Sequence, residues 1–255
     1  LSGELDPDLT KFDEISATVD EVDLVPTDSL NLHPGIQSKL EGRFDTLLPV
    51  QSLAVENGAT EGRDQLVVSA TATGKTLVGE MAGIDRVLNN KGKMLFLVPL
   101  VALANQKYND FREEYGDICD VSLRVGSSRI SGDDNRFDPS ADIIVGTYEG
   151  IDHALRTGKD LGTIGTVVID EVHTLGEGER GHRLDGLISR LKYYCEVDRT
   201  VAQQHDGRAG PHDHGDTQWI YLSATVGNTS ELAETLGAQL IEFEERPRPI
   251  ERHVT

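Results

Sequence analysis

The sequence predicts an α/β fold in which a parallel sheet is covered by helices on both faces. Short apolar runs with the length of buried strands recur along the chain, and amphipathic helical patterns lie between most of them. Such alternation is typical of parallel sheets, because each crossover helix covers one face. The length of 255 residues suits one such domain better than two small ones.

The expected strands are short runs rich in Val, Ile, Leu and aromatic residues. They span residues 66–68, 94–98, 121–125, 143–145, 167–169, 219–222 and 240–243. Three helices are expected from apolar residues at helical spacing, beginning at Lys75, Leu184 and Asn228. Glu231 follows Asn228 at the spacing of a capping box, and Gly237 ends that helix.

The chain divides into an acidic N-terminal arm at 1–28, one α/β domain at 29–245 and a linker at 246–255. The arm is only weakly periodic, and Pro247 and Pro249 keep the linker extended.

A polar segment from Val201 to Asp216 is predicted to be a surface loop. Its His205, His212 and His214 could bind a metal ion, but the loop is too polar to fix the ligands, so a solvated loop is favoured.

Composition excludes several classes of protein. A content of 37% hydrophobic and 27% charged residues fits a globular chain rather than a disordered one. No apolar run reaches the ~18 residues that span a bilayer, and the acidic start lacks a secretory pattern. Two distant cysteines, Cys119 and Cys195, give no disulfide framework. We therefore expect a cytoplasmic protein without a membrane span.

The chain carries 44 acidic and 24 basic residues, which gives a net charge of −20. This field disfavours non-specific attraction to nucleic acid. Only 8 of the basic residues are Lys. A carboxylate-rich, lysine-poor surface favours adaptation to high salt, where charges are screened. An ordinary solvated acidic face is the alternative.

The strongest chemical signal is a loop between the first expected strand and its helix. It reads Ser69-Ala70-Thr71-Ala72-Thr73-Gly74-Lys75-Thr76. Backbone N–H groups at a helix N-terminus bind phosphate oxygens, Lys75 adds a charge, and the Thr76 hydroxyl suits Mg²⁺. Ser69 replaces the first Gly of the usual pattern, and a chance Gly-Lys-Thr on a surface turn is the alternative.

A second signal follows the strand 167–169, which ends in Asp170 and Glu171. Ligands of parallel sheets bind at the carboxyl ends of the strands. Asp170 would hold Mg²⁺, directly or through water, and Glu171 would orient and activate an attacking water. Adjacent surface carboxylates are the alternative.

Tyr221-Leu222-Ser223-Ala224-Thr225 is a third motif, again at a strand end. In this order, the phosphate loop, Asp-Glu-Val-His and Ser-Ala-Thr resemble the first motor domain of superfamily II helicases, which is a RecA-like P-loop NTPase. The resemblance implies ATP and Mg²⁺ as cofactors. It also implies that His173, Ser223 and Thr225 couple the nucleotide state to strand contact.

Further matches extend the resemblance over most of the chain. Leu47 to Gln51 is similar to the family's Q motif, in which Gln51 would read the adenine edge. The regions after two other strands are similar to its strand-contacting motifs. The implied nucleic-acid contacts are Pro99, Ala102, Gly126 (near Arg124 and Arg129) and Thr147.

The run Glu179-Arg180-Gly181 resembles the Ski-like subgroup, as found in archaea, which suits a haloarchaeal source. Arg180 would make an interdomain contact. The resemblance implies a second RecA-like domain in cis beyond the linker, carrying the arginine finger, so this chain alone should hydrolyse ATP poorly.

The expected activity is ATP-dependent unwinding of single-stranded or partly duplex nucleic acid, DNA slightly favoured over RNA. One alternative is an ATP-binding clamp or adaptor that does not unwind. A transporter-type ATPase is the other. The run Leu1-Ser2-Gly3-Glu4 resembles the transporter signature, but that signature belongs between the phosphate loop and Asp170, so the order is wrong.

Overall fold

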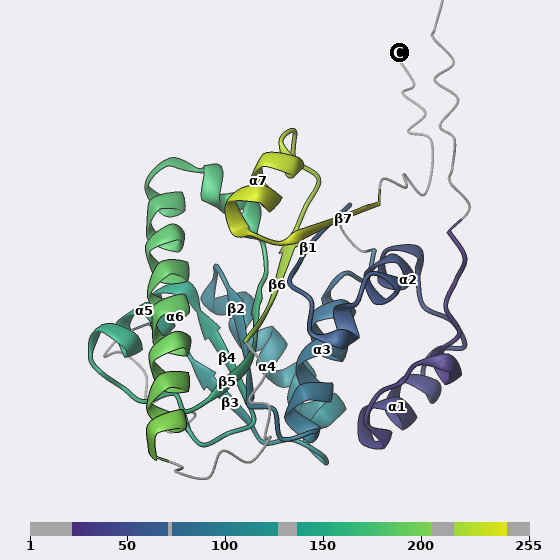
Figure 1. The fold of residues 1–255 in the computed structure, drawn as a ribbon, viewed down its shortest axis with the longest axis horizontal. Helices are drawn as coiled ribbons and strands as arrows, with labels where there is room; N and C mark the ends of the chain where they lie inside the picture. The colour runs from purple at the N-terminus through teal and green to yellow at the C-terminus, as the bar shows by residue number, and fades with distance from the viewer. Residues whose placement is uncertain (1–21, 71–72, 127–136, 206–216, 244–255) are drawn as a thin grey trace, which may run out of the picture.

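The computed structural model describes residues 22–70, 73–126, 137–205 and 217–243, which contain one seven-stranded sheet (Figure 1). The strand order is β3-β4-β2-β5-β6-β1-β7, and every pairing between neighbours is parallel. All seven expected runs are therefore confirmed as strands. They are β1 Gln65–Ser69, β2 Lys93–Val98, β3 Val121–Arg124, β4 Ile143–Thr147, β5 Ile164–Ile169, β6 Gln218–Ser223 and β7 Gln239–Phe243.

Helices cover both faces of this sheet, as predicted (Figure 1). The first four pack on one face and the last three on the other. They are α1 Pro34–Glu41, α2 Pro49–Glu56, α3 Thr76–Leu88, α4 Val101–Tyr115, α5 Tyr148–Arg156, α6 Gly178–His205 and α7 Thr229–Leu236. None of these helices within the described residues is long and apolar enough to cross a membrane.

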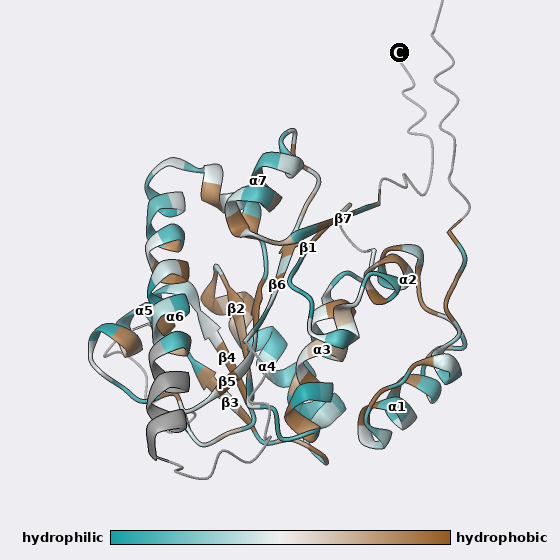
Figure 2. Cartoon of the chain, in the orientation of Figure 1, coloured by the Kyte–Doolittle hydropathy of each residue, from teal (hydrophilic) through white to brown (hydrophobic). Residues whose placement is uncertain are grey.

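Each central strand contributes to two hydrophobic cores. In β1, Val67 packs under α3 whereas Leu66 and Val68 face the α6 side, because successive side chains point to opposite faces. The strands are consequently apolar on consecutive residues, which Figure 2 shows as hydrophobic strands at the centre of the molecule. This burial explains why continuous apolar runs predicted the sheet correctly.

Helix α6 differs from its prediction at both ends. The apolar stripe starts at Leu184 and ends at Leu191, but the helix runs from Gly178 to His205. The prediction that a loop begins at Val201 is therefore wrong. The first turn, before Leu184, is polar, and the turns after Leu191 mix aromatic and aliphatic residues with many charged and polar ones, so the apolar stripe from Leu184 to Leu191 does not mark either end of the helix. Residues 206–216, with His212 and His214, lie outside the described part of the chain.

Helix α7 starts after Asn228 and stops at Gly237, which adopts the left-handed conformation (φ 69°) that glycine allows. The capping-box prediction is corrected in detail. The Asn228 side chain donates to the Glu231 carboxylate, and no side-chain bond caps the helix backbone.

Residues 22–28 of the expected arm pack against the domain. The Val25 N–H donates to the Ser52 hydroxyl at 3.0 Å, and the Thr27 hydroxyl donates to the Phe44 carbonyl at 2.6 Å. The rest of the expected arm and the whole expected linker lie outside the described residues.

Candidate functional site

The carboxyl ends of all seven strands lie at one edge of the sheet, because the strands are parallel. Ligands of such sheets bind at this edge. The phosphate loop follows β1, the two carboxylates follow β5, and the Ser-Ala-Thr segment follows β6, which lies between them. The fold therefore gathers the three predicted motifs on neighbouring strands.

Within the described part of the phosphate loop, hydroxyl groups form hydrogen bonds that stabilise the turn. The Thr73 hydroxyl donates to the Ala70 carbonyl at 2.9 Å and is itself hydrogen-bonded to the Ser69 hydroxyl. Ser69, which replaces the usual glycine, thus stabilises the turn. Lys75 is 8% exposed and precedes the first turn of α3, which begins at Thr76. Thr71 and Ala72 lie outside the described residues.

Gln51 links helix α2 to the phosphate loop through hydrogen bonds. Its side-chain oxygen accepts from the Leu48 N–H at 2.9 Å, and its amide nitrogen donates to the Gly74 carbonyl at 2.8 Å. Gly74 has φ of 77°, and a Cβ there would lie 2.5 Å from the Gln51 nitrogen. Only glycine fits this contact. The second N–H of the Gln51 side-chain amide takes part in neither of these two hydrogen bonds.

Glu171 follows the buried strand β5 in an unusual conformation. Its φ of 59° and ψ of 39° are left-handed, which is uncommon for a residue with a Cβ. The Glu171 N–H donates to an Asp170 carboxylate oxygen at 3.0 Å. Its carbonyl accepts from the Thr174 hydroxyl at 3.0 Å. The chain therefore turns sharply at the two predicted carboxylates, and the sequence alone does not indicate this turn.

The two carboxylates create a site that favours positive charge. Burial raises the pKa of Asp170, and the neighbouring Glu171 raises it further, while Lys75 acts in the opposite direction. The Tyr148 hydroxyl donates to the Asp170 carbonyl. Burial and the Asp170 charge raise the pKa of Tyr148, so its hydroxyl remains a hydrogen-bond donor.

His173 lies between the carboxylates and the Ser-Ala-Thr segment. Its Nδ1 accepts from the Ala224 N–H at 3.4 Å and lies 3.3 Å from a Glu171 carboxylate oxygen. One ring nitrogen cannot accept from Ala224 and donate to Glu171 at the same time. Ser223 is buried and donates to the Ala224 carbonyl at 2.8 Å, whereas Thr225 is exposed.

The predicted strand contacts also lie at the carboxyl edge. Pro99 is half-buried and Ala102 is exposed, where β2 leads into α4, and Gly126 follows β3. Thr147 is only 3% exposed. Its hydroxyl caps α5 by accepting from the Gly150 N–H at 3.0 Å. A strand contact at this position would therefore use neighbouring groups rather than the Thr147 hydroxyl.

Of the flanking arginines, Arg124 is buried with its guanidinium 5.1 Å from the Phe137 ring centroid. Arg129 lies outside the described residues. Arg180 is exposed in the first turn of α6.

Metal-binding side chains do not form a cluster within the described residues. These residues contain no group of three or more His, Cys, Asp or Glu side chains that could hold a metal ion. His205 ends α6, and its two predicted partners lie outside the described residues. Thr76 and Asp170 offer a hydroxyl and a carboxylate, the hard oxygen donors that Mg²⁺ accepts when nucleotide phosphates complete its shell. These residues fit that ion.

A match to the description DEAD/DEAH box helicase covers residues 48–233. The chain belongs to the DEAD/DEAH box helicase family. Its sheet and helices are the RecA-like α/β fold expected from the resemblance. In this structure, the phosphate loop, the Asp170–Glu171 turn and the Ser-Ala-Thr segment lie at one edge of the sheet.

Relatives with a helicase name align over most of the chain. A Methanocaldococcus jannaschii protein named as a probable ATP-dependent helicase is 46% identical over 97% of the chain and 29% of its own length. ATP-dependent DNA helicase Hel308 of Caldivirga maquilingensis is 36% identical over 79% of the chain and 24% of its own length. The corresponding Hel308 of Pyrococcus horikoshii is 32% identical over 89% of the chain. The chain thus spans less than a third of these relatives.

Two contacts within the site could not be read from the motifs. Tyr148 lies inside a motif matched for strand contact, but its hydroxyl reaches the Asp170 carbonyl on another strand. The contact between Gln51 and Gly74 joins segments far apart in the sequence. The motifs contain these residues, but only the fold shows which partners they contact.

Proposed function

We propose that this chain is the first RecA-like motor domain of an archaeal, Ski-like superfamily II helicase, which uses ATP hydrolysis to move along and unwind nucleic acid. The observation that carries the proposal is the turn at Glu171. It presents a carboxylate at the same edge of the sheet as the phosphate loop and connects through His173 to Ala224. A nucleotide site linked in this way to the next strand end suits a motor better than a static binder.

In this proposal, the loop residues bind the phosphates of ATP and Gln51 binds its adenine. Ala70, Thr71, Ala72, Thr73, Gly74, Lys75 and Thr76 are the proposed ATP-binding residues, and Lys75 would neutralise phosphate charge. Gln51 reads the adenine edge with the part of its amide not bonded to Gly74.

Glu171 orients the attacking water and accepts its proton. Thr76 and Asp170 would hold Mg²⁺, which would offset phosphate charge during transfer.

The position of β6 between β5 and β1 supports coupling between the nucleotide site and the strand contacts. A second RecA-like domain in cis would close over the nucleotide, with Arg180 at the contact between domains. His173, Ser223 and Thr225 would respond to loss of the γ-phosphate and shift the strand contacts at Pro99, Ala102, Gly126 and Thr147.

The domain boundaries that we propose are an arm at 1–28, the motor domain at 29–245 and a linker at 246–255. The acidic, lysine-poor composition further supports a haloarchaeal source. Single-stranded or partly duplex DNA is the favoured substrate, because several relatives are named DNA helicases.

The decisive experiment measures ATP turnover of the full-length protein with single-stranded DNA or RNA across a salt series. We expect stimulation by a strand, stronger with DNA. A clamp or adaptor without unwinding activity is the second candidate, because the part-buried contacts of the loop at Thr73 and Gly74 would serve nucleotide binding with or without turnover. Strand binding that requires ATP but gives neither turnover nor unwinding would favour the clamp.

A further inference from the structure

Tyr148 connects two parts of the site that the motifs treat separately. It is the first residue of α5, directly after Thr147 at the end of β4. Its hydroxyl donates to the Asp170 carbonyl at the end of β5, and its ring is half-buried. We propose that Tyr148 is a positioning residue that holds Glu171 in the left-handed conformation needed for hydrolysis. This inference rests on the proposed function.

The argument begins with the backbone of Glu171. A left-handed conformation at a residue with a Cβ is unfavourable, so the surrounding bonds must hold it. The Asp170–Glu171 peptide is held at both ends. Its N–H donates to the Asp170 carboxylate at 3.0 Å, and its carbonyl accepts from Tyr148. On the other side, the Glu171 carbonyl accepts from the Thr174 hydroxyl and N–H at 3.0 and 3.1 Å.

Tyr148 differs from the other groups in this set because it comes from another element. The bonds from Asp170 and Thr174 are local, and they would rotate together with the turn. The Tyr148 hydroxyl instead anchors the turn to the junction of β4 and α5. Without it, the N–H of the Asp170–Glu171 peptide would keep its local bond to the Asp170 carboxylate, and the peptide carbonyl would lose its bond to another element. The preceding Asp170 N–H would still donate to the Leu97 carbonyl of β2 at 2.9 Å, so this bond fixes the end of β5 but not the peptide that follows it.

The backbone segment that carries Tyr148 is tightly packed. A Cβ at Gly146 would lie 2.6 Å from the Ile151 side chain, and one at Gly150 would lie 2.7 Å from the Arg124 carbonyl. The segment from 146 to 150 therefore has little room to shift by itself. A displacement of this segment, for example by a bound strand, would reach the Asp170 carbonyl through Tyr148.

The test is Tyr148→Phe in the full-length protein, which removes the hydroxyl and keeps the ring. We expect kcat for strand-stimulated ATP hydrolysis to fall about tenfold or more, because small misplacement of a catalytic group is costly. The affinity for ATP should stay within about twofold, since the phosphate loop is not touched. A role in stability alone would not separate kcat from ATP affinity in this way.

Tyr115→Phe is the matched control. Tyr115 is fully buried and donates to the Glu80 carboxylate at 2.8 Å, at the far end of α4. It should lower the melting temperature at least as much as Tyr148→Phe does and leave kcat unchanged. In a Glu171→Gln background, adding Tyr148→Phe should slow single-turnover hydrolysis no further, because both changes act on one group.

Three results would overturn the inference. Tyr148→Phe could leave kcat at the wild-type value, Tyr115→Phe could lower kcat equally, or the double variant could be slower than Glu171→Gln alone. If the wild-type full-length protein does not hydrolyse ATP, the proposed function fails and the inference fails with it. Wild-type turnover that is insensitive to Tyr148→Phe removes the inference alone.

Discussion

Glu171 is the residue on which the proposed chemistry depends most directly. In the full-length protein, Glu171→Gln keeps the shape of the side chain but removes the group that accepts the proton of the attacking water. We expect ATP binding to persist and turnover to fall by about 10²–10⁴-fold. Equilibrium binding and steady-state ATPase assays measure the two effects. Glu177→Gln, an exposed acid in the same segment, is the control. Unchanged turnover in Glu171→Gln would refute the role.

His173 should affect coupling more than the chemical step. Its Nδ1 contacts the Ala224 N–H and the Glu171 carboxylate, which belong to different motifs. In His173→Ala we expect the ratio of strand-stimulated to basal turnover to fall about fivefold or more, while basal turnover changes less. His182→Ala replaces an exposed histidine of α6 and should leave the ratio unchanged. An unaltered ratio in His173→Ala would argue against a coupling role.

At the scale of elements, helices α3 and α4 are joined by a bond between Tyr115 and Glu80. Part of the Glu80 side chain reaches the surface, but its carboxyl is enclosed, and this burial raises its pKa despite nearby Lys107 and Arg43. The folded protein thus keeps this proton to higher pH than the unfolded chain does. Above the ordinary glutamate pKa, unfolding releases the proton, so this group lowers stability as pH rises.

The prediction from this bond concerns Glu80→Gln, which still offers an oxygen to Tyr115 but cannot ionise. The melting temperature of the variant relative to wild type should increase by a few degrees between ~pH 5 and ~pH 8. Glu113→Gln, on the exposed face of α4, should show no such trend. Parallel melting curves for Glu80→Gln and wild type across this range would contradict the prediction.

Elements with apolar periodicity were predictable, and those defined by long-range contacts were not. The strands followed from apolar runs such as Met94 to Val98, since burial on both faces requires them. Helices α1, α2, α4 and α5 were not individually predicted; α1, for example, buries only a few apolar residues, such as Ile36 and Leu40. The motifs predicted which strand ends carry the site. They did not indicate the left-handed turn at Glu171, because neighbours from several elements stabilise it.

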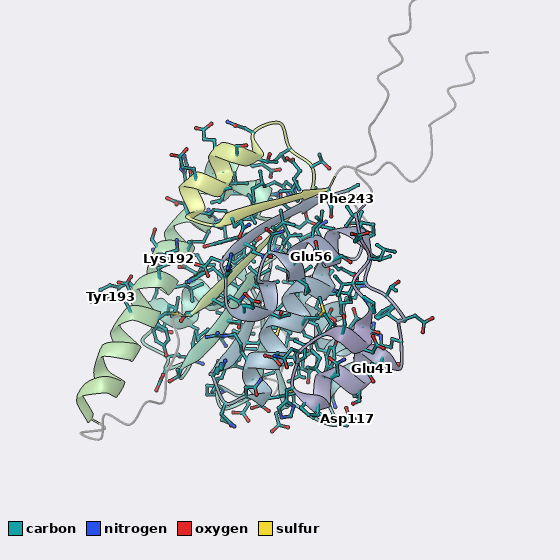
Figure 3. All side chains as sticks on the ribbon, turned by 45° about the vertical axis from the view of Figure 1, so that its right-hand side comes forward. Glu41, Glu56, Asp117, Lys192, Tyr193 and Phe243 are labelled. Atoms are coloured by element: carbon teal, nitrogen blue, oxygen red, sulfur yellow. The ribbon has the colours of Figure 1, made fainter. Side chains whose placement is uncertain are left out.

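The whole molecule carries a net charge of −20, and exposed carboxylates such as Glu41, Glu56 and Asp117 are labelled in Figure 3. Like charges repel across a compact surface, and salt screens this repulsion because the Debye length falls from ~10 Å at 0.1 M to ~3 Å at 1 M. We expect the melting temperature to rise with KCl by several degrees over this range.

Neutralising exposed acids provides the control for this salt effect. Glu56→Gln combined with Glu113→Gln removes two negative charges outside the proposed site and should reduce the dependence of the melting temperature on KCl. Maximum stability at low ionic strength would contradict adaptation to high salt.

The strand order has a consequence for how the chain acquires its site during synthesis. Within the described sheet, β1 pairs only with β6 and β7, the last strands to be made. The Trp219 N–H at the start of β6 donates to the Asp64 carboxylate just before β1, across 155 positions. The strand that leads into the phosphate loop therefore acquires its partners in the sheet only after nearly the whole domain has left the ribosome. We therefore expect a nascent chain to complete its nucleotide site only when β6, the strand proposed to couple hydrolysis to strand contact, is also in place.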